Sequence, residues 1–370
     1  MIDRIVLFPY YLTLKIRNAL YNSGRKPSAK ASVPTICVGG ITVGGTGKTP
    51  FTEMILRVLQ NSPEWKERNV AVLSRGYKRN STGFQIVKQN GTTRKYGDEP
   101  MQIKRKFPST TVAVCRNRVE GCDYLTHPDK SVVCSEEGIR PADMIILDDA
   151  YQARELRASL NIVLVDYNRP IFKDMLLPMG MLRDIPERLF DADIVVVTKC
   201  PSDLHDSERE DFAKGLKYKD YDFPASSMVT APNGRRQLLL FATVDYLPFV
   251  PLTDKTETRF VYSKSIVLFT GIAQDAPLFY YLTDKYRVVE RLIFPDHHQY
   301  VWADFDKIIR ALQENPTAGA VTTEKDAQRL MDFHKLEEPL PSRVFYAPIS
   351  MRFLDPTEEQ LFAERITGLV

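Results

Sequence analysis

The clearest chemical signal in the sequence is a glycine-rich segment, ITVGGTGKTP, over residues 41–50. A short apolar strand is predicted before it, over 35–38, and apolar residues at helical spacing follow it over 51–59. Strand, glycine-rich loop, Gly-Lys-Thr and helix, in this order, are the context of a phosphate-binding P-loop. Thr42 stands where the general pattern has its first glycine. The segment predicts that the protein binds a nucleoside triphosphate.

The residue types in this loop indicate how it would hold phosphate. Backbone N–H groups in a loop without bulky side chains converge on phosphate oxygens, and the following helix presents its positive N-terminal end. A lysine there reaches the β- and γ-phosphates, and a threonine hydroxyl ligates Mg²⁺. We expect the nucleotide to contact Gly44, Gly45, Thr46, Gly47, Lys48 and Thr49, with Thr49 also on the metal.

Two adjacent carboxylates, Asp148 and Asp149, follow the aliphatic run 144–147. A Mg²⁺ ion that bridges two phosphates needs an anionic partner opposite the P-loop hydroxyl. A single aspartate at a strand end is often only a helix cap. Because two occur in succession in a chain with a P-loop, the pattern favours a metal site.

A second pair of acids, Asp98 and Glu99, lies in the tetrapeptide Gly-Asp-Glu-Pro, which by itself is more typical of a solvated turn. Phosphoryl transfer to an alcohol, however, requires a group that accepts the hydroxyl proton, and a carboxylate supported by a histidine would serve. His297 and His298 are placed where a strand of the second half should meet a loop. A catalytic role for one of them and a solvated loop remain equally open here, and a metal site would lack a third ligand.

Buried strands must position these groups. Short, almost continuous apolar runs separated by helix-length segments predict a parallel sheet covered on both faces. Loops at the carboxyl ends of such strands carry ligand-binding groups, and Ser74-Arg-Gly-Tyr77 follows one of them. The predicted strands of this first sheet lie at 35–38, 69–74, 111–115, 142–147, 161–166 and 193–198.

The composition changes after this alternation. Segments 238–241 and 258–262 are predicted to be linking strands, and a second strand–helix alternation follows, with strands at 265–270, 286–294, 318–323 and 343–348. We therefore predict a kinase-like P-loop domain over 31–240 and a smaller α/β domain with linker strands over 241–370.

Residues 1–30 differ from the rest of the chain. They combine aromatic and aliphatic residues with six basic residues and a single acid, Asp3. No uncharged run approaches the roughly 18 residues that span a bilayer, and no signal-peptide pattern is present. One interpretation is an amphipathic helix that lies in a membrane interface. The other is a helix packed on the globular body with its basic side in water, and composition does not separate the two.

The length, composition, net charge and cysteine count exclude some classes of protein. The 370 residues, 44% hydrophobic and 26% charged, are those of an ordinary globular protein of about two domains. A net charge of +3 without basic tracts gives no indication of nucleic-acid binding. The five cysteines are scattered, so neither a disulfide framework nor a zinc site is predicted, and a reducing cytoplasm fits best.

An ordered set of motifs along nearly the whole chain resembles the tetraacyldisaccharide 4′-kinases of lipid A biosynthesis. The P-loop alone would indicate only a superfamily. The matching segments are ITVGGTGKTP (41–50), LSRGY (73–77), GDEP (97–100), NRV (117–119), ILDD with Gln152 (146–149), LLPMG with Leu182-Arg183 (176–180), GIA (271–273), FPDHH (294–298) and TEKD (323–326).

This resemblance implies a peripheral enzyme on the cytoplasmic face of the bacterial inner membrane, which transfers the γ-phosphate of ATP, with Mg²⁺, to the 4′-hydroxyl of an acylated glucosamine disaccharide 1-phosphate. It implies a P-loop NTPase-like α/β/α sandwich, a two-stranded linker, a smaller α/β domain and a membrane-docking helix in residues 1–30. Carried over by motif, Asp98 is the base, His297 its partner and Lys48 a phosphate contact. Thr49, Asp148 and Asp149 hold the metal, and the residues lining the nucleotide or lipid-phosphate site are Glu99, Arg118, Gln152 and Arg183.

The sequence departs from the family pattern at four positions: Gly40 replaces Asn, Ala150 replaces Gly, Ala153 replaces His and Asp184 replaces Glu. The Ala153 change removes an imidazole beside the metal carboxylates, which puts fine nucleotide placement in doubt but not the reaction class.

Two other functions stay open from the residues: a P-loop kinase of a soluble metabolite, and a P-loop NTPase that acts as a switch or metallochaperone. A guanine-specific switch would use [Asn/Thr]-Lys-x-Asp. Thr198 and Lys199 match this motif, but Pro201 occupies the aspartate position, which counts against a GTPase.

Overall fold

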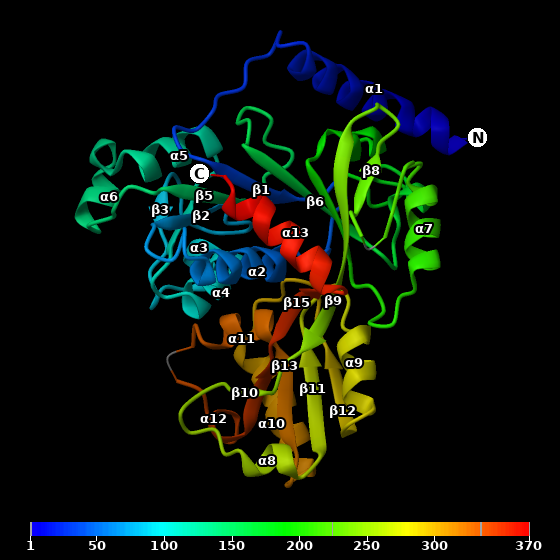
Figure 1. The fold of residues 1–370 in the computed structure, drawn as a ribbon. Coiled ribbons are helices and arrows are strands. Elements are labelled where there is room, and N and C mark those ends of the chain that lie inside the picture. The colour runs from blue at the N-terminus through cyan, green and yellow to red at the C-terminus, as the bar shows by residue number, and fades with distance from the viewer. Residues whose placement is uncertain (1, 224, 334, 370) are drawn as a thin grey trace.

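Two β-sheets with helices packed on them make up the computed structural model, which describes residues 2–223, 225–333 and 335–369 (Figure 1). The larger sheet has ten strands and the smaller has five. We call the larger sheet and its helices the first lobe, and residues 250–347, which contain the smaller sheet, the second lobe.

Seven strands of the larger sheet are parallel neighbours, in the order β9-β7-β6-β1-β5-β2-β4. The antiparallel strands β3, β8 and β15 pair with β4 or β9 at the margins. The strands are β1 (Thr35–Gly39), β2 (Val70–Ser74), β3 (Gln85–Ile86), β4 (Thr111–Val114), β5 (Met144–Asp148), β6 (Leu160–Asp166), β7 (Ile194–Thr198), β8 (Met228–Thr230), β9 (Arg236–Tyr246) and β15 (Ile349–Phe353).

Helices cover both faces of this sheet, because successive side chains of each buried strand point to opposite sides. In β7, Ile194 and Val196 join the core under α2 and α13, while Val195 and Val197 join the core under α5 and α7. The predicted α/β/α sandwich is confirmed. Its helices are α1 (Ile2–Asn22), α2 (Lys48–Asn61), α3 (Thr93–Tyr96), α4 (Asp98–Lys106), α5 (Arg118–Thr126), α6 (Val132–Glu136), α7 (Asp206–Gly215) and α13 (Pro356–Thr367), with short 3₁₀ turns at Pro128–Lys130, Ile171–Lys173 and Pro186–Asp191.

The second lobe is a smaller α/β layer with strand order β10-β14-β13-β11-β12. Its strands are β10 (Val250–Pro251), β11 (Ser265–Thr270), β12 (Arg287–Ile293), β13 (Gly319–Thr323) and β14 (Val344–Ala347). Its helices are α8 (Arg259–Tyr262), α9 (Ala276–Thr283), α10 (Trp302–Glu314), α11 (Glu324–Leu330) and α12 (Leu340–Arg343). The linking strand predicted at 258–262 is wrong, because the helix α8 occupies that segment.

The connection between the lobes is the antiparallel pair β9 and β15, in which Ser350 is opposite Asp245. After β14 the chain therefore returns to the larger sheet, and α13 packs on α2 through an edge-to-face contact of Phe362 with Phe51, 5.4 Å between ring centroids. Figure 1 shows α13 lying over the first lobe beside α2, with one end near β15. The division into 31–240 and 241–370 stays a prediction, while the chain passes from the larger sheet to the smaller one between β9 and β10 and returns between β14 and β15.

Helix α1 packs one face on the first lobe, through Tyr10, Tyr11 and the buried Leu14. Its polar anchor is Asp184, a buried carboxylate that accepts hydrogen bonds from Asn18 (2.9 Å) and Arg17 (3.2 Å). Within the described residues, no helix combines the length and apolar character needed to cross a bilayer.

The buried carboxyl of Glu358 in α13 gives the fold a pH dependence. It accepts a hydrogen bond from the backbone N–H of Phe241 (3.2 Å) and lies 3.5 Å from the Arg209 guanidinium. Burial raises the pKa of this carboxyl from 4.5 to about 7, and the partners offset only part of that effect. The folded protein therefore holds a proton that the unfolded chain releases between these pH values, so stability falls as the pH rises through about 7.

We predict that Glu358→Gln stabilises the protein above pH 7, because glutamine reproduces the uncharged carboxyl. A pKa difference of this size corresponds to about 3 kcal/mol at pH 8.5, and the effect is much smaller at pH 5. Urea unfolding at both pH values measures it, with the exposed neighbour Glu359→Gln as the control. An equal effect at both pH values would contradict the assignment.

Candidate active site

The P-loop connects β1 to α2, as predicted. Gly44 and Gly47 adopt positive φ angles of 86° and 87°, which a residue with a side chain reaches only with strain. A Cβ atom on Gly47 would lie 2.7 Å from the Cε of Met351, so close packing by β15 also requires glycine there. Lys48 is the first residue of α2, and Thr49 follows it half-buried. The hydroxyl of Thr46 is buried and has no hydrogen-bond partner among the described residues.

The carboxyl end of β5 carries Asp148 and Asp149 next to this loop, since Val38 of β1 is the register partner of Asp148. Asp148 accepts hydrogen bonds from Ser74 (3.2 Å) and Thr52 (3.4 Å). Burial, together with the neighbouring Asp149, raises the pKa of Asp148 to about 6. The sequence therefore brings both carboxylates to the P-loop, as predicted.

Asp149 lies among cations. Its carboxylate is 3.8 Å from the Lys48 ammonium and pairs with both terminal nitrogens of Arg183. Burial alone would raise the pKa of Asp149, but Lys48 and Arg183 outweigh burial and hold that pKa below its ordinary value. Burial also lowers the pKa of Lys48, against the opposing effect of Asp149. The site therefore holds Lys48, Arg183 and Asp149 as one charge cluster.

Two predicted ligand-binding residues hold the backbone where the P-loop begins. The carbonyl of Gly40 accepts hydrogen bonds from Gln152 (2.6 Å) and from Arg183 (3.0 and 3.2 Å). A Cβ atom at Gly40 would lie 3.2 Å from the Leu164 carbonyl oxygen, so the residue at this position is tightly confined. In this arrangement Gln152 and Arg183 fix the loop, and their contact with a ligand stays a prediction.

Arg118 is buried between the ends of β4 and β5. Its guanidinium donates to the carbonyls of Cys115 and Asp148, the latter over 3.4 Å, while its Nε has no partner within the described residues. Burial lowers the pKa of Arg118, with Asp148 and Asp149 opposing that shift. Arg118 thus places a buried positive charge near the Asp148 and Asp149 carboxylates.

Asp98 begins α4 and is only 5% exposed. Its Oδ2 is 3.0 Å from Nδ1 of His297 and accepts two hydrogen bonds from Arg329, from Nε (3.1 Å) and Nη2 (2.6 Å). Burial would raise the pKa of Asp98, but the hydrogen bonds from His297 and Arg329 hold it well below its usual range. The pairing of Asp98 with His297, which the family resemblance implied, is present across 199 positions of sequence.

Two residues that the sequence analysis named only as parts of the motifs LSRGY and TEKD, Tyr77 and Lys325, complete this group. Lys325 donates to Nε2 of His297 (3.3 Å) and pairs with Glu99 at 2.8 Å. Tyr77 packs edge-to-face on the His297 ring, 5.5 Å between centroids. Lys325 lies within TEKD and Arg329 follows it one helical turn later, and this spacing was the available signal for Arg329.

The second histidine has a different place. His298 is 2.7 Å from the Asp304 carboxylate near the start of α10 and stacks on Phe294. Lys199, considered for guanine recognition, pairs with Asp166 at 2.6 Å. Both are therefore held by neighbours outside the Asp98 group.

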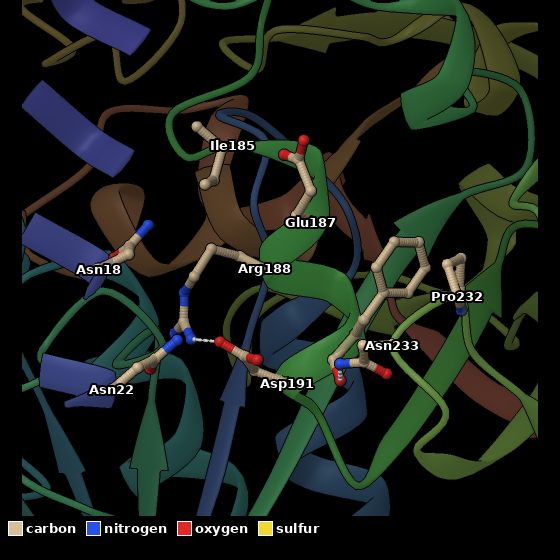
Figure 2. A pocket seen from close by; sticks show the side chains of 9 residues that line it. Asn18, Asn22, Ile185, Glu187, Arg188, Asp191, Pro232 and Asn233 are labelled. Carbon is tan, nitrogen blue, oxygen red and sulfur yellow. Dashed lines mark hydrogen bonds and ion pairs between the residues drawn. The ribbon is translucent and has the colours of Figure 1, made fainter. Parts of the chain in front are cut away.

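A cavity of about 430 Å³ lies beneath α1, and Figure 2 shows it between the helix and the 3₁₀ turn at Pro186–Asp191. The Arg188–Asp191 ion pair forms part of its wall. No predicted site residue lines this cavity.

Comparison with known proteins decides the family. A model of the tetraacyldisaccharide-1-P 4′-kinase family matches residues 4–367. The chain belongs to this family. It is similar to the tetraacyldisaccharide 4′-kinase of Phocaeicola vulgatus, with 37% identity over 96% of this chain and 91% of that one. The enzyme of the same name from Flavobacterium johnsoniae is 35% identical, over 95% and 93%.

A solved structure shares the fold. The crystal structure of LpxK from Aquifex aeolicus in complex with ATP superposes with a TM-score of 0.69, covering 99% of both chains. The sequences are 23% identical, so this likeness shows the architecture of the 4′-kinase family in the present chain. The expected fold is thereby confirmed.

Proposed function

We propose that this family member transfers the γ-phosphate of ATP to the 4′-hydroxyl of an acylated glucosamine disaccharide 1-phosphate. The observation that carries the proposal is the Asp98–His297 contact, which presents a buried carboxylate from α4 in a lobe whose P-loop carries Lys48. Family membership over residues 4–367 supplies the acceptor class.

The transfer step follows from these groups. The acceptor hydroxyl oxygen attacks the γ-phosphorus, a new O–P bond forms, and the bond from phosphorus to the β,γ-bridging oxygen breaks to release ADP. The hydroxyl proton passes to the Asp98 carboxylate. An ionised carboxylate that orients the hydroxyl suits a loose transition state, in which the proton leaves late.

ATP is assigned to the P-loop. The backbone at Gly44, Gly45, Thr46 and Gly47 and the N-terminus of α2 face the phosphates, and Lys48 neutralises charge on the transferring group. The charge of Glu99 acts on Lys48 and on Asp148, which brings α4 into the same electrostatic field.

The residues around Asp148 fit a Mg²⁺ ion. The buried carboxyl of Asp148 and the half-buried carboxyl of Asp149 lie at the same sheet edge as the half-buried Thr49, and the raised pKa of Asp148 marks a negative charge that lacks compensation. Mg²⁺ commonly uses one or two carboxylates and completes its shell with phosphate oxygens and water. When bound, the ion would neutralise charge between the β- and γ-phosphates, held by Thr49, Asp148 and Asp149.

Arg118, Arg183, Gln152 and Glu99 are assigned to the rim of this site. Arg183 and Gln152 donate hydrogen bonds to the Gly40 carbonyl, so they affect ligand binding by fixing the position of the P-loop. Arg118 donates to the Asp148 carbonyl and orders the metal carboxylates.

Membrane contact is assigned to α1 within residues 1–30. Phe8, Leu12, Ile16 and Leu20 recur every fourth residue and are 36–58% exposed, on a helix whose opposite face packs on the lobe. Large apolar side chains are also exposed in the 3₁₀ turn and loop after β6, at Phe172, Met175, Met179 and Met181. The carbonyl of Met181 accepts from Val43 of the P-loop (2.8 Å), which joins this apolar surface to the nucleotide site. Peripheral binding at the cytoplasmic face of the inner membrane would bring the enzyme to an acylated substrate.

The first test is transfer of labelled γ-phosphate from ATP to tetraacyldisaccharide 1-phosphate in detergent micelles with Mg²⁺. We expect a doubly phosphorylated lipid with the wild-type protein. Lys48→Ala should abolish it, because the γ-phosphate loses its cation. ATP hydrolysis that proceeds without lipid acceptor, or transfer to a soluble metabolite, would overturn the proposal.

Asp98→Asn should lower kcat by ~10²-fold or more, because asparagine keeps the shape but cannot accept the proton. ATP affinity, measured by calorimetry, should stay within about threefold, since Asp98 does not belong to the phosphate cradle. Near-wild-type turnover would contradict its role as the base.

The double change Leu12→Glu and Ile16→Glu should weaken binding to vesicles of anionic phospholipid by about tenfold or more, since each charge opposes burial in the interface. Cosedimentation measures the effect. Tyr280→Glu, at a 67% exposed position of α9, is the matched control and should bind normally. Equal loss in both proteins would argue against α1 as the docking element.

A further inference from the structure

Helix α11 of the second lobe presents two cations to the groups around Asp98. Lys325 and Arg329 are four residues apart and therefore lie on one face of the helix. That face meets α4, where Asp98 and Glu99 form the first turn. Each cation is paired with one member of this acidic dipeptide.

The hydrogen bonds to Asp98 are distributed unevenly between its two oxygens. His297 and both donors of Arg329 converge on Oδ2. Among the described residues, no donor is recorded on Oδ1. A carboxylate held in this way keeps one oxygen as the anchored atom and the other as a free acceptor.

The partners of His297 assign its tautomer. The Lys325 ammonium has only donors, so Nε2 of His297 accepts its hydrogen bond. The proton is then on Nδ1, which donates to Asp98. His297 therefore contributes one donor to Oδ2, while Arg329 contributes two donors and a guanidinium charge.

Arg329 is itself fixed on its far side. Its Nη1 donates to Asp326 (2.7 Å) and to the Gly271 carbonyl (3.0 Å), and Asp326 in turn accepts from the Gly271 N–H (3.0 Å). The side chain is 1% exposed. A buried guanidinium held from both sides has one orientation, and that orientation determines where the Asp98 carboxylate points.

We propose that Arg329 is a positioning residue for phosphoryl transfer: it anchors Asp98 through Oδ2 and thereby leaves Oδ1 to meet the acceptor hydroxyl. The inference rests on the proposed function, in which Asp98 takes the hydroxyl proton. It gives the second lobe a direct part in the chemistry, because the geometry of the base in the first lobe depends on an arginine of α11.

The charge of Arg329 also keeps Asp98 ionised. The charged or titratable groups around Asp98 are Glu99 on α4, Asp296 and His297 in the loop after β12, and Lys325, Asp326 and Arg329 on α11. Without Arg329 the buried carboxyl would lose two hydrogen bonds and a neighbouring positive charge, so its pKa would rise. Activity that needs ionised Asp98 would then begin to fall at a higher pH when the solution is acidified.

The test compares Arg329→Gln, Arg329→Lys and Arg105→Gln in the full chain. Arg105 is the matched control, because it also joins α4 to α11 at Gln328 (2.9 Å) and pairs with Asp332 (3.2 Å) just after that helix, with no hydrogen bond to Asp98. Transfer to the disaccharide lipid is followed in micelles with saturating ATP and Mg²⁺, from about pH 5.5 to about pH 9.

We expect Arg329→Gln to lower kcat by ~10²-fold, with less than about threefold change in the KM for ATP, and to move the acid limb of the kcat profile up by about one pH unit. Arg329→Lys keeps the charge, so its acid limb should stay near that of the wild type. Arg105→Gln should leave both kcat and the position of the acid limb unchanged. In an Asp98→Asn background, Arg329→Gln should add little further loss, since it acts through Asp98.

An unchanged acid limb in Arg329→Gln would overturn the inference, as would an equal shift in Arg105→Gln or identical profiles for the lysine and glutamine variants. A melting curve at each pH separates a folding defect from these effects, and the lysine variant still tests the inference if the glutamine variant does not fold. Absence of transfer by the wild-type protein would instead contradict the proposed function.

Discussion

The buried charge of Asp98 is the constraint on which the relation between the two lobes depends. A carboxylate that is 5% exposed costs several kcal/mol to desolvate unless donors replace its water. The first lobe supplies α4 and its N-terminal end, but the hydrogen-bonding side chains on Oδ2, His297 and Arg329, come from the second lobe. The charge is therefore fully compensated only where the lobes meet as they do here. Neither lobe presents the finished site by itself.

The remaining groups follow from the parallel sheet. The carboxyl ends of neighbouring parallel strands meet at one edge, so β1 delivers the P-loop and β5 delivers Asp148 and Asp149 side by side. β2 ends in the same place and contributes Ser74, which binds Asp148. The site gathers charges of both signs, and Asp148, which lies deepest, has its pKa raised to about 6 while that of Asp149 is lowered by its cations. Adjacent residues thus have opposite electrostatic environments.

Sequence patterns predicted most of this architecture because the decisive features are local. The P-loop, the six buried strands of the first sheet and the carboxylates after β5 each occupy a short run of residues. The return of β15 and α13 to the larger sheet was missed, since an edge strand of five residues has the same local pattern in either sheet. Segment 258–262 was mistaken for a strand because β-branched and aromatic residues also fill the short helix α8. Arg329 was missed because its contact with Asp98 spans 231 positions and its motif, TEKD, stops three residues before it.

Asp184 connects the amino-terminal helix to the nucleotide site through buried contacts. Its carboxylate is fully buried and accepts from Arg17 and Asn18 of α1, while the backbone carbonyl of the preceding Arg183 accepts from Tyr10 (3.2 Å). Arg183 then reaches the Gly40 carbonyl with its guanidinium. The dipeptide Arg183-Asp184 therefore links α1, which carries the exposed apolar side chains, to the start of the P-loop. Because each of these bonds is part-buried or buried, the position of the nucleotide site relative to the apolar surface is set by the fold and not by a loose tether.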